Sequence, residues 1–134
     1  MTGVQTCALP ICILIFSIGI LALMGLQAQS IRNTVEAKYR NEAAYLANQI
    51  IGQMWVDRAN LANYDTGAGA SPQMTAWCNQ VANTLPRVTV GATNSPTIAV
   101  AGSQVTVTVF WQLPGADSPQ RQFSVVALIN DSGP

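Results

Sequence analysis

One stretch decides the fold of this chain: residues 13–64, ILIFSIGILALMGLQAQSIRNTVEAKYRNEAAYLANQIIGQMWVDRANLANY. From residue 27 onward it has no proline and a single glycine, and it is rich in Ala, Glu, Gln, Leu and Arg, which favour helix. Apolar residues recur in steps of three or four, at Ile31, Val35, Tyr39, Ala43, Leu46, Ile50 and Met54. Because this is the period of one helical face, the stretch predicts a continuous helix to about Tyr64, of roughly 50 residues.

The first third of this helix is apolar on every side. Residues 1–31 carry no charge, the first charged residue is Arg32, and the only polar side chain between Ile13 and Leu26 is Ser17. The run is shorter than the ~20 residues that a membrane-spanning helix needs. It is long enough for the core of a signal peptide, or for the remaining part of a longer membrane span.

The residues before this run, MTGVQTCALPI (1–11), match the translation of a common short-read sequencing adapter at every position. They lack the basic residues with which a signal peptide begins, and Pro10 is expected to break any helix that runs through it. We therefore interpret residues 1–12, with Cys12 at the junction, as a non-native leader. Residues 13–31 are then expected to be a truncated membrane helix, and residues 32–134 a head that includes the amphipathic half of the helix.

The composition argues against nucleic-acid binding and against catalysis. Charged residues make up 9% of the chain and the net charge is zero, without the basic excess of a nucleic-acid-binding face. The chain has no histidine, on which metal sites and acid–base catalysis most often depend. The acidic residues Asp57, Asp65, Asp117 and Asp131 are scattered, and Asp57 with Arg58 is interpreted as a solvated helix face. We therefore predict no enzyme, and no catalytic, metal-binding or cofactor-binding residues.

A second, shorter helix is predicted at residues 72–85, PQMTAWCNQVANTL. Ser71 is placed to cap its N-terminus, with Pro72 at the first helical position, and Pro86 lies just beyond its end. Its apolar face consists of Met74, Trp77, Cys78, Val81 and Leu85. With the leader set aside, Cys78 is the only cysteine and is interpreted as a small buried apolar side chain.

The last third of the chain is predicted to form strands. Residues 97–100, 105–113 and 121–129 form an antiparallel meander, with a tight turn around Gly102-Ser103 and residues 87–90 as a candidate fourth strand. In the longest strand Val105, Val107, Val109 and Trp111 alternate with polar residues, and Phe123, Val125, Ala127 and Ile129 share one face of the last strand. One face of this sheet is expected to pack on the amphipathic helix, so the predicted fold class is α+β, with a long N-terminal helix on a small antiparallel β-sheet.

The aromatic residues are assigned to this helix–sheet core or to contacts outside it. Trp55, Trp77 and Trp111 are expected to help fill the core, with the alternative that one of them is exposed for contact with another subunit. Tyr39 and Tyr45 lie six residues apart and are therefore expected on different faces of the helix.

Residues 13–64, and above all GLQAQSIRN followed by AAYLANQI, resemble the minor pilins of the type IV pilus modification protein (PilV) family. Residues 72–134 resemble them in layout only. The resemblance implies a pilin-like fold and a low-abundance structural or priming subunit of a type IV pilus. Its implied partners are other minor pilins, the major pilin, the inner-membrane assembly platform and, for the intact precursor, prepilin peptidase. Nucleic acid is not an implied direct partner. The implied location is the inner membrane with a periplasmic head, and then the pilus at the cell surface.

The resemblance also implies a dual role for the apolar helix, first in the inner membrane and then in the packed core of the filament. The residues assigned to this role are Ile13, Ile15, Phe16, Ile20, Leu23 and Leu26. Prepilins carry a basic leader ending in Gly, then usually Phe at the new N-terminus and Glu five residues into the mature chain. None of these features is present, so the site of prepilin cleavage and methylation is absent from this sequence.

Three alternatives stay open. The first is a minor pseudopilin of type II secretion; only Asp117 and Asp131 lie near the end of the chain, so the calcium site of many major pseudopilins is not expected. A pilin-like head that binds a surface or ligand is the second. The third is a signal peptide cleaved near residues 28–30. The helical periodicity continues through Ile31, which argues against this cleavage.

The positive charges after the apolar run argue against the pilin orientation. Arg32, Lys38 and Arg40 favour a cytoplasmic location for the residues that follow the run.

Overall fold

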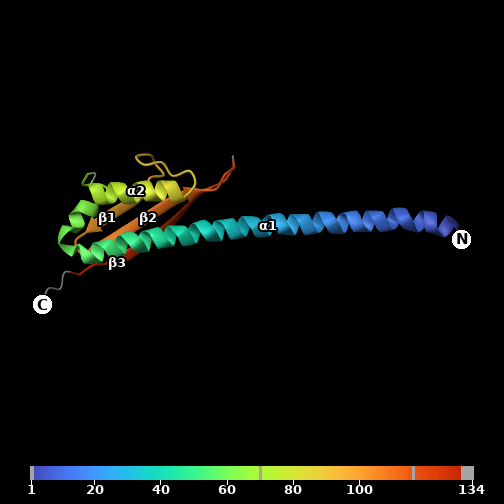
Figure 1. Cartoon of the computed structure of the whole chain (residues 1–134), viewed down its shortest axis with the longest axis horizontal. Helices are drawn as coiled ribbons and strands as arrows, with labels where there is room; N and C mark the ends of the chain where they lie inside the picture. The colour runs from blue at the N-terminus through green and yellow to red at the C-terminus, as the bar shows by residue number, and fades with distance from the viewer. Residues whose placement is uncertain (1, 70, 116, 131–134) are drawn as a thin grey trace. The chain divides into compact units, whose positions relative to one another are not determined.

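The computed structural model describes residues 2–69, 71–115 and 117–130, and side chains from Ala8 onward. The elements follow in the order α1, η1, α2, β1, β2 and β3 (Figure 1). The chain divides into two compact units, one ending at Ala37 and one beginning at Lys38. We call the second unit the head, and it contains every element after α1 together with the last part of α1 itself.

Helix α1 extends from Thr2 to Val56, so the predicted single long helix is confirmed over most of its length. The predicted end at about Tyr64 is wrong. Asp57 leaves the helical region, with φ −108° and ψ 45°, and a 3₁₀ segment, η1 (Arg58–Tyr64), follows with a kink at Asn60. The physical reason is local, because the Asp57 carboxylate accepts hydrogen bonds from downstream side chains and so competes with continued helix.

The predicted break at Pro10 is also wrong, since α1 passes through this residue. A proline inside a helix removes one backbone donor and displaces the carbonyl four residues earlier. These effects are confined to one turn, so a helix can continue through a proline at a local cost, usually with a kink.

The part of α1 inside the head buries one continuous face. Its buried side chains are Ala43, Leu46, Ala47, Ile50, Ile51 and Met54. The predicted stripe is therefore confirmed from Ala43 to Met54, and Tyr39 packs partly buried against the same core. Ile31 is 63% exposed, so its assignment to this stripe is wrong, because the core of the described residues includes none before Tyr39.

Helix α2 (Pro72–Thr84) begins at the predicted residue with the predicted cap, and it ends one residue before the predicted 85 because Leu85 is extended, with φ −101° and ψ 143°. The Ser71 hydroxyl accepts a hydrogen bond from the Met74 backbone N–H at 3.2 Å, as an N-cap residue does. The predicted apolar face is confirmed, because Met74, Trp77, Cys78, Val81 and Leu85 are all buried. The Trp77 indole Nε1–H donates to the Leu46 carbonyl oxygen at 2.9 Å, which joins α2 directly to α1.

The sheet has three antiparallel strands in the order β1 (Thr97–Ala101), β2 (Gln104–Gln112) and β3 (Gln120–Leu128). The predicted hairpin turn is confirmed, since Ala101 pairs with Gln104 across Gly102-Ser103. Gly102 has φ +62° whereas Ser103 does not have positive φ, which is the pattern of a type II′ turn. A glycine at the first turn position is required by this backbone.

Residues 87–90 do not form the candidate fourth strand. Arg87 adopts φ +56°, a left-handed conformation that turns the chain instead of extending it. Its carbonyl oxygen accepts a hydrogen bond from the Asn94 side chain, and the preceding Pro86 carbonyl accepts one from the Gln112 backbone N–H at 3.3 Å. The segment is therefore a loop that is held at the end of β2 by a backbone hydrogen bond, and its Val88 side chain is buried.

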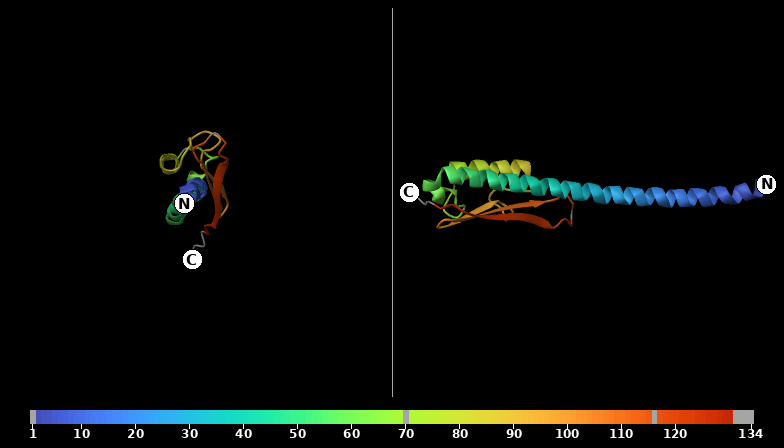
Figure 2. Two further views of the ribbon diagram at one scale, coloured as in Figure 1. Left: turned by 90° about the vertical axis from the view of Figure 1, so that its right-hand side faces the viewer. Right: turned by 90° about the horizontal axis from the view of Figure 1, so that it is seen from below.

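Within the head, both helices cover the same face of the sheet (Figure 2). The inward side chains of β2, Val105, Val107, Val109 and Trp111, are buried, and Phe123, Val125 and Ala127 of β3 pack partly buried on the same core. Ile129, just after β3, is buried as well. The α+β fold, with a long helix packed on a small antiparallel sheet, is confirmed.

The three tryptophans do not behave alike. Trp77 and Trp111 are buried in the core, as predicted, although the Trp111 indole N–H has no hydrogen-bond partner in the described part of the chain. Trp55 is 43% exposed, so its assignment to the core is wrong. It lies near the end of α1, one turn after the buried Ile51, and the Arg58 guanidinium is 5.9 Å from its ring centroid. The expectation for the tyrosines is confirmed, because Tyr39 is partly buried and Tyr45 is exposed.

Candidate membrane-anchoring segment

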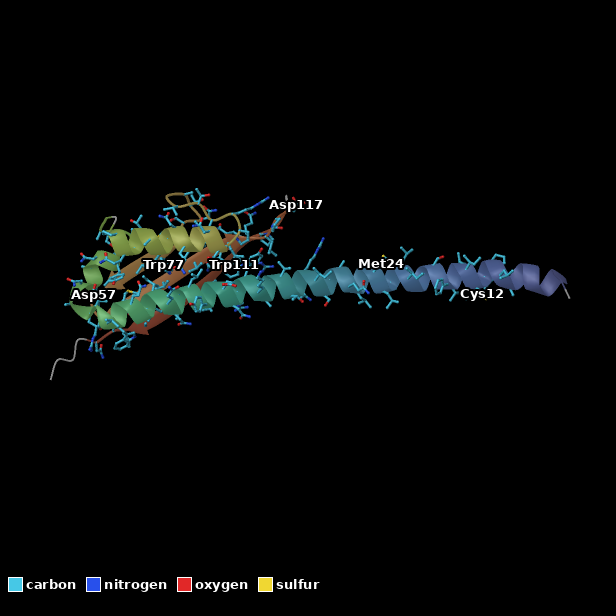
Figure 3. All side chains as sticks on the ribbon, in the orientation of Figure 1. Cys12, Met24, Asp57, Trp77, Trp111 and Asp117 are labelled. Atoms are coloured by element: carbon cyan, nitrogen blue, oxygen red, sulfur yellow. The ribbon has the colours of Figure 1, made fainter. Side chains whose placement is uncertain are left out.

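The anchoring segment, residues 8–31 of α1, has apolar side chains on all sides of the helix. The residues assigned to the membrane and filament-core role are exposed to between 39% (Ile20) and 69% (Phe16 and Leu26), with Ile13, Ile15 and Leu23 between these values. Leu14, Ile18, Leu21 and Met24 are exposed to a similar degree. Figure 3 shows side chains leaving the helix in different directions around Cys12 and Met24. The described residues of the chain give this surface no protein partner.

The segment is long enough to cross a bilayer. By length and composition, Ala8–Val56 is the one helix among the described residues that could do so, and its apolar window lies near the N-terminus. At 1.5 Å per residue, residues 8–31 extend about 36 Å, and residues 13–31, without the leader interpreted as non-native, about 29 Å, compared with about 30 Å for the hydrocarbon core of a membrane. Such helices can serve as membrane anchors, and signal sequences share these properties.

The polar side chains in and just after the segment have local partners. The Ser17 hydroxyl donates to the Ile13 carbonyl oxygen at 2.7 Å, and the Thr34 hydroxyl donates to the Ser30 carbonyl oxygen at 2.8 Å. A hydroxyl that bonds back to its own helix can enter hydrocarbon at a lower cost than an unpaired one. Ser17 is therefore compatible with an apolar solvent around the whole segment.

The glycines of the segment are not required by the chain itself. A Cβ atom added at Gly19 or Gly25 would meet no other atom within 4 Å. Both positions are therefore open in the single chain, and any role in close packing needs a neighbouring helix from another molecule.

The head carries a polar network where α1 ends. The Asp57 carboxylate accepts hydrogen bonds from the Asn60 side-chain amide at 2.6 Å and from the Tyr64 hydroxyl at 3.3 Å. Burial raises the pKa of Tyr64, and the negative charge of Asp57 and its hydrogen bond raise it further. Asp57 therefore ends the helix and does not lie on a helix face as interpreted, whereas Arg58 is exposed, as expected. The sequence signal that was overlooked is an Asp followed three residues later by Asn, a pairing that favours turns.

The remaining candidate residues are Cys78 and the scattered acidic residues. Cys78 is buried, as predicted, and burial raises the pKa of its thiol, which lowers the fraction of reactive thiolate at neutral pH. In the part of the chain that the structure describes, no three His, Cys, Asp or Glu side chains gather in a way that could hold a metal ion. Asp117 is exposed between β2 and β3, and Asp131 lies outside the described residues, so the expectation about calcium stays a prediction.

Comparison with known proteins adds no relative: no protein-family model, no curated protein and no solved structure matches the chain.

Proposed function

We propose that this protein is a minor pilin of a type IV pilus, anchored in the inner membrane before assembly and then a low-abundance structural or priming subunit of the filament. One observation carries the proposal: the same helix, α1, has a charge-free exposed apolar segment and, further along, the buried face on which an α+β head is built. The sequence resemblance of residues 13–64 to minor pilins of the PilV family supports it.

The physical logic is that the apolar segment needs two successive apolar environments. Covering a large aliphatic or aromatic side chain contributes on the order of 1.5–3 kcal/mol, so a segment with this many exposed is unfavourable in water. Lipid can cover the segment first, and the helices of neighbouring pilins can cover it afterwards. The segment then passes from the membrane to the filament without being exposed to water. On this proposal the head faces the periplasm and contacts other pilins, and the chain has a structural role with no cofactor and no catalytic residue.

The most direct test is the native DNA upstream of the Ile13 codon in the source genome. We expect an in-frame sequence for a basic leader, a Gly, a Phe and a Glu five residues into the mature chain. A genome that encodes MTGVQTCALPI at this place, or an ordinary signal peptide, contradicts the minor-pilin proposal.

A second test uses the genomic gene with a C-terminal epitope, expressed in its own host. We expect the tagged protein in the inner membrane and, at low abundance, in filaments sheared from the cells. Leu21→Arg is expected to remove it from both, because a charge at the centre of a membrane helix costs about 2.5–3.5 kcal/mol. Val90→Arg, an exposed position of the head, is the matched control and should leave both fractions unchanged.

The distribution of the wild-type protein separates the alternatives. Recovery with a type II secretion complex and not with pili identifies a pseudopilin. Filaments that assemble normally without the protein but fail to attach to a surface identify an adhesive head. Recovery only as a soluble periplasmic protein contradicts the minor pilin, the pseudopilin and the adhesive pilin-like head, and is the result expected for a cleaved signal peptide.

A further inference from the structure

The two edges of the sheet differ in how their backbone groups are satisfied. At the outer edge of β1, the Thr66 backbone N–H donates to the Ile98 carbonyl oxygen at 2.9 Å, and the Ile98 N–H donates to the Thr66 hydroxyl at 3.2 Å. The Val100 N–H donates to the Asp65 carboxylate at 3.4 Å. Asp65 and Thr66 therefore close this edge in place of a neighbouring strand.

The outer edge of β3 has no such cover. In the described ranges 2–69, 71–115 and 117–130, β3 pairs with β2 on one side and no element pairs with its other side. Ile98 and Val100 direct their backbone groups away from β2, so their partners Val107 and Val105 do not form hydrogen bonds with β1. Because hydrogen bonding alternates along an antiparallel strand, the odd-numbered residues of β2 form their backbone hydrogen bonds with β3. The Ile129 N–H, which donates to the Ser103 carbonyl at 2.7 Å, continues this pattern. The even-numbered residues of β3, from Gln120 to Leu128, thus direct N–H and C=O groups outward.

This open edge lacks the features with which proteins usually prevent strand addition. The pairing of β3 with β2 runs through nine residues without a bulge, and β3 contains no proline and no lysine. The side chains at its outward-directed positions are uncharged, and two of them, Val126 and Leu128, are 55% and 61% exposed. The one charged residue of β3, Arg121, stands at a position whose backbone groups are directed at β2, so the outward-directed positions form a long, uncharged edge that is complementary to a further extended backbone.

We propose that the open edge of β3 is a docking site for an extended, uncharged segment of a partner protein, which adds to the sheet as a fourth strand. Backbone hydrogen bonds at Gln122, Ser124 and Val126 hold the incoming strand. Its side chains opposite Val126 and Leu128 are apolar, and those opposite Gln120 and Gln122 are polar. The docking site lies entirely within the head, and the choice of a different protein over a second copy rests on the membrane anchoring proposed above.

A second copy of this chain is the less favourable occupant. Parallel pairing of two β3 strands in register would set Arg121 beside Arg121, and like charges on adjacent strands repel. Antiparallel pairing centred on Ser124 avoids this, but it reverses one head relative to the other. The Lys38–Val56 part of α1 runs roughly along the strands (Figures 1 and 2), so the two helices would then point in opposite directions. The antiparallel pair sets the Lys38 ends of the two helices at opposite ends of the dimer, which is unfavourable for two chains anchored in one membrane as proposed above.

The test measures binding of a labelled peptide to the full chain in lipid nanodiscs. The probe is QVTVTVFWQ, the sequence of β2, which already pairs with β3 within the fold, and its control carries N-methyl groups on alternate residues so that it cannot donate hydrogen bonds to one edge. Val126→Lys adds a charge at the open edge without removing a buried side chain. Ala99→Lys adds the same charge to the same outer face of the sheet, but on the closed edge, and is the matched control.

We expect saturable binding to the wild type and to Ala99→Lys. Binding to Val126→Lys should be weakened at least roughly tenfold, because a lysine charge at the edge opposes the addition of an uncharged strand. Thermal unfolding followed by circular dichroism checks that both variants fold. The proposal is overturned by absent binding to the wild type, by equal losses in the two variants, or by equal binding of the N-methylated peptide. If the wild type forms dimers without the peptide and Val126→Lys abolishes them, the edge binds a second copy of this chain. That result overturns the choice of a different protein. Failure of membrane anchoring leaves these readouts intact, because they report on the head alone.

Discussion

The two parts of α1 differ in their surroundings. Around Leu21 the helix is apolar on all sides and exposed, whereas around Ile50 one face is buried and the opposite positions are mostly polar. In the head the sheet and α2 cover the buried face, and the large apolar side chains of the helix outside it are Tyr45, Trp55 and Val56. In the anchoring segment nothing in the described chain covers the helix, and apolar residues occupy every face. The difference indicates that the second part carries its partner in its own sequence, and that the first part depends on an apolar environment outside it.

The largest effect is expected from removing side-chain volume on the buried face. Ile50→Ala should lower the free energy of unfolding of the head by about 2–5 kcal/mol, because it leaves a cavity in a fully covered site. Leu21→Ala, the matched change on the exposed part, should change it by less than about 0.5 kcal/mol. Urea unfolding of the full chain in detergent, followed by tryptophan fluorescence, measures both. Equal effects of the two substitutions would remove the distinction between the two parts of α1.

A smaller effect is expected from the contact that joins α2 to α1. Trp77→Phe removes the hydrogen bond from the indole to the Leu46 carbonyl and part of a buried ring, and should lower the free energy of unfolding by about 1–3 kcal/mol. Trp55→Phe changes the same residue type at a position 43% exposed and should be nearly neutral. The same denaturation assay, read by circular dichroism, compares them, and a neutral Trp77→Phe would show that this bond does not stabilise the head.

The smallest effect concerns alkaline pH. Burial raises the pKa of Cys78 above its ordinary value of 9.0, and burial, then Asp57, raise the pKa of Tyr64 above 10.0. Each group holds its proton more tightly in the folded state, so its contribution to stability is complete below the ordinary pKa and is lost as pH rises through the folded value. We expect the head to lose stability from about pH 9 upward. Cys78→Ala should flatten the first part of this decline and Tyr64→Phe the part above pH 10, and unchanged slopes would contradict the assignment.

Much of the fold follows from local patterns in the sequence. The stripe from Ala43 to Met54, the capped helix after Ser71 and the alternation of β2 are each set by spacing and by residue type, and the structure has all three. The Gly102-Ser103 turn was predictable for the same reason, because few residues adopt its backbone.

The predictions from sequence are wrong where the structure depends on contacts between residues distant in sequence, or where a side chain competes with the backbone for hydrogen bonds. The end of α1 depends on the Asp57 carboxylate reaching Tyr64, which periodicity cannot show. Residues 87–90 have strand-like composition, but the left-handed Arg87 turns them into a loop beside β2. For the anchoring segment, charge and length alone indicated an apolar environment. The identity of that environment is a property of other molecules, so no pattern within this chain specifies it.

The two cysteines whose side chains the structure describes have a practical consequence as reporters. The thiol of Cys78 is enclosed by the folded head, whereas that of Cys12 stands on the outside of α1. A water-soluble alkylating reagent should therefore modify Cys78 only during transient openings of the head, at a rate that measures how often they occur. Insertion of α1 into lipid should slow modification of Cys12 instead. Mass spectrometry that resolves the two sites would thus record folding and membrane insertion separately, in one sample and without an added label.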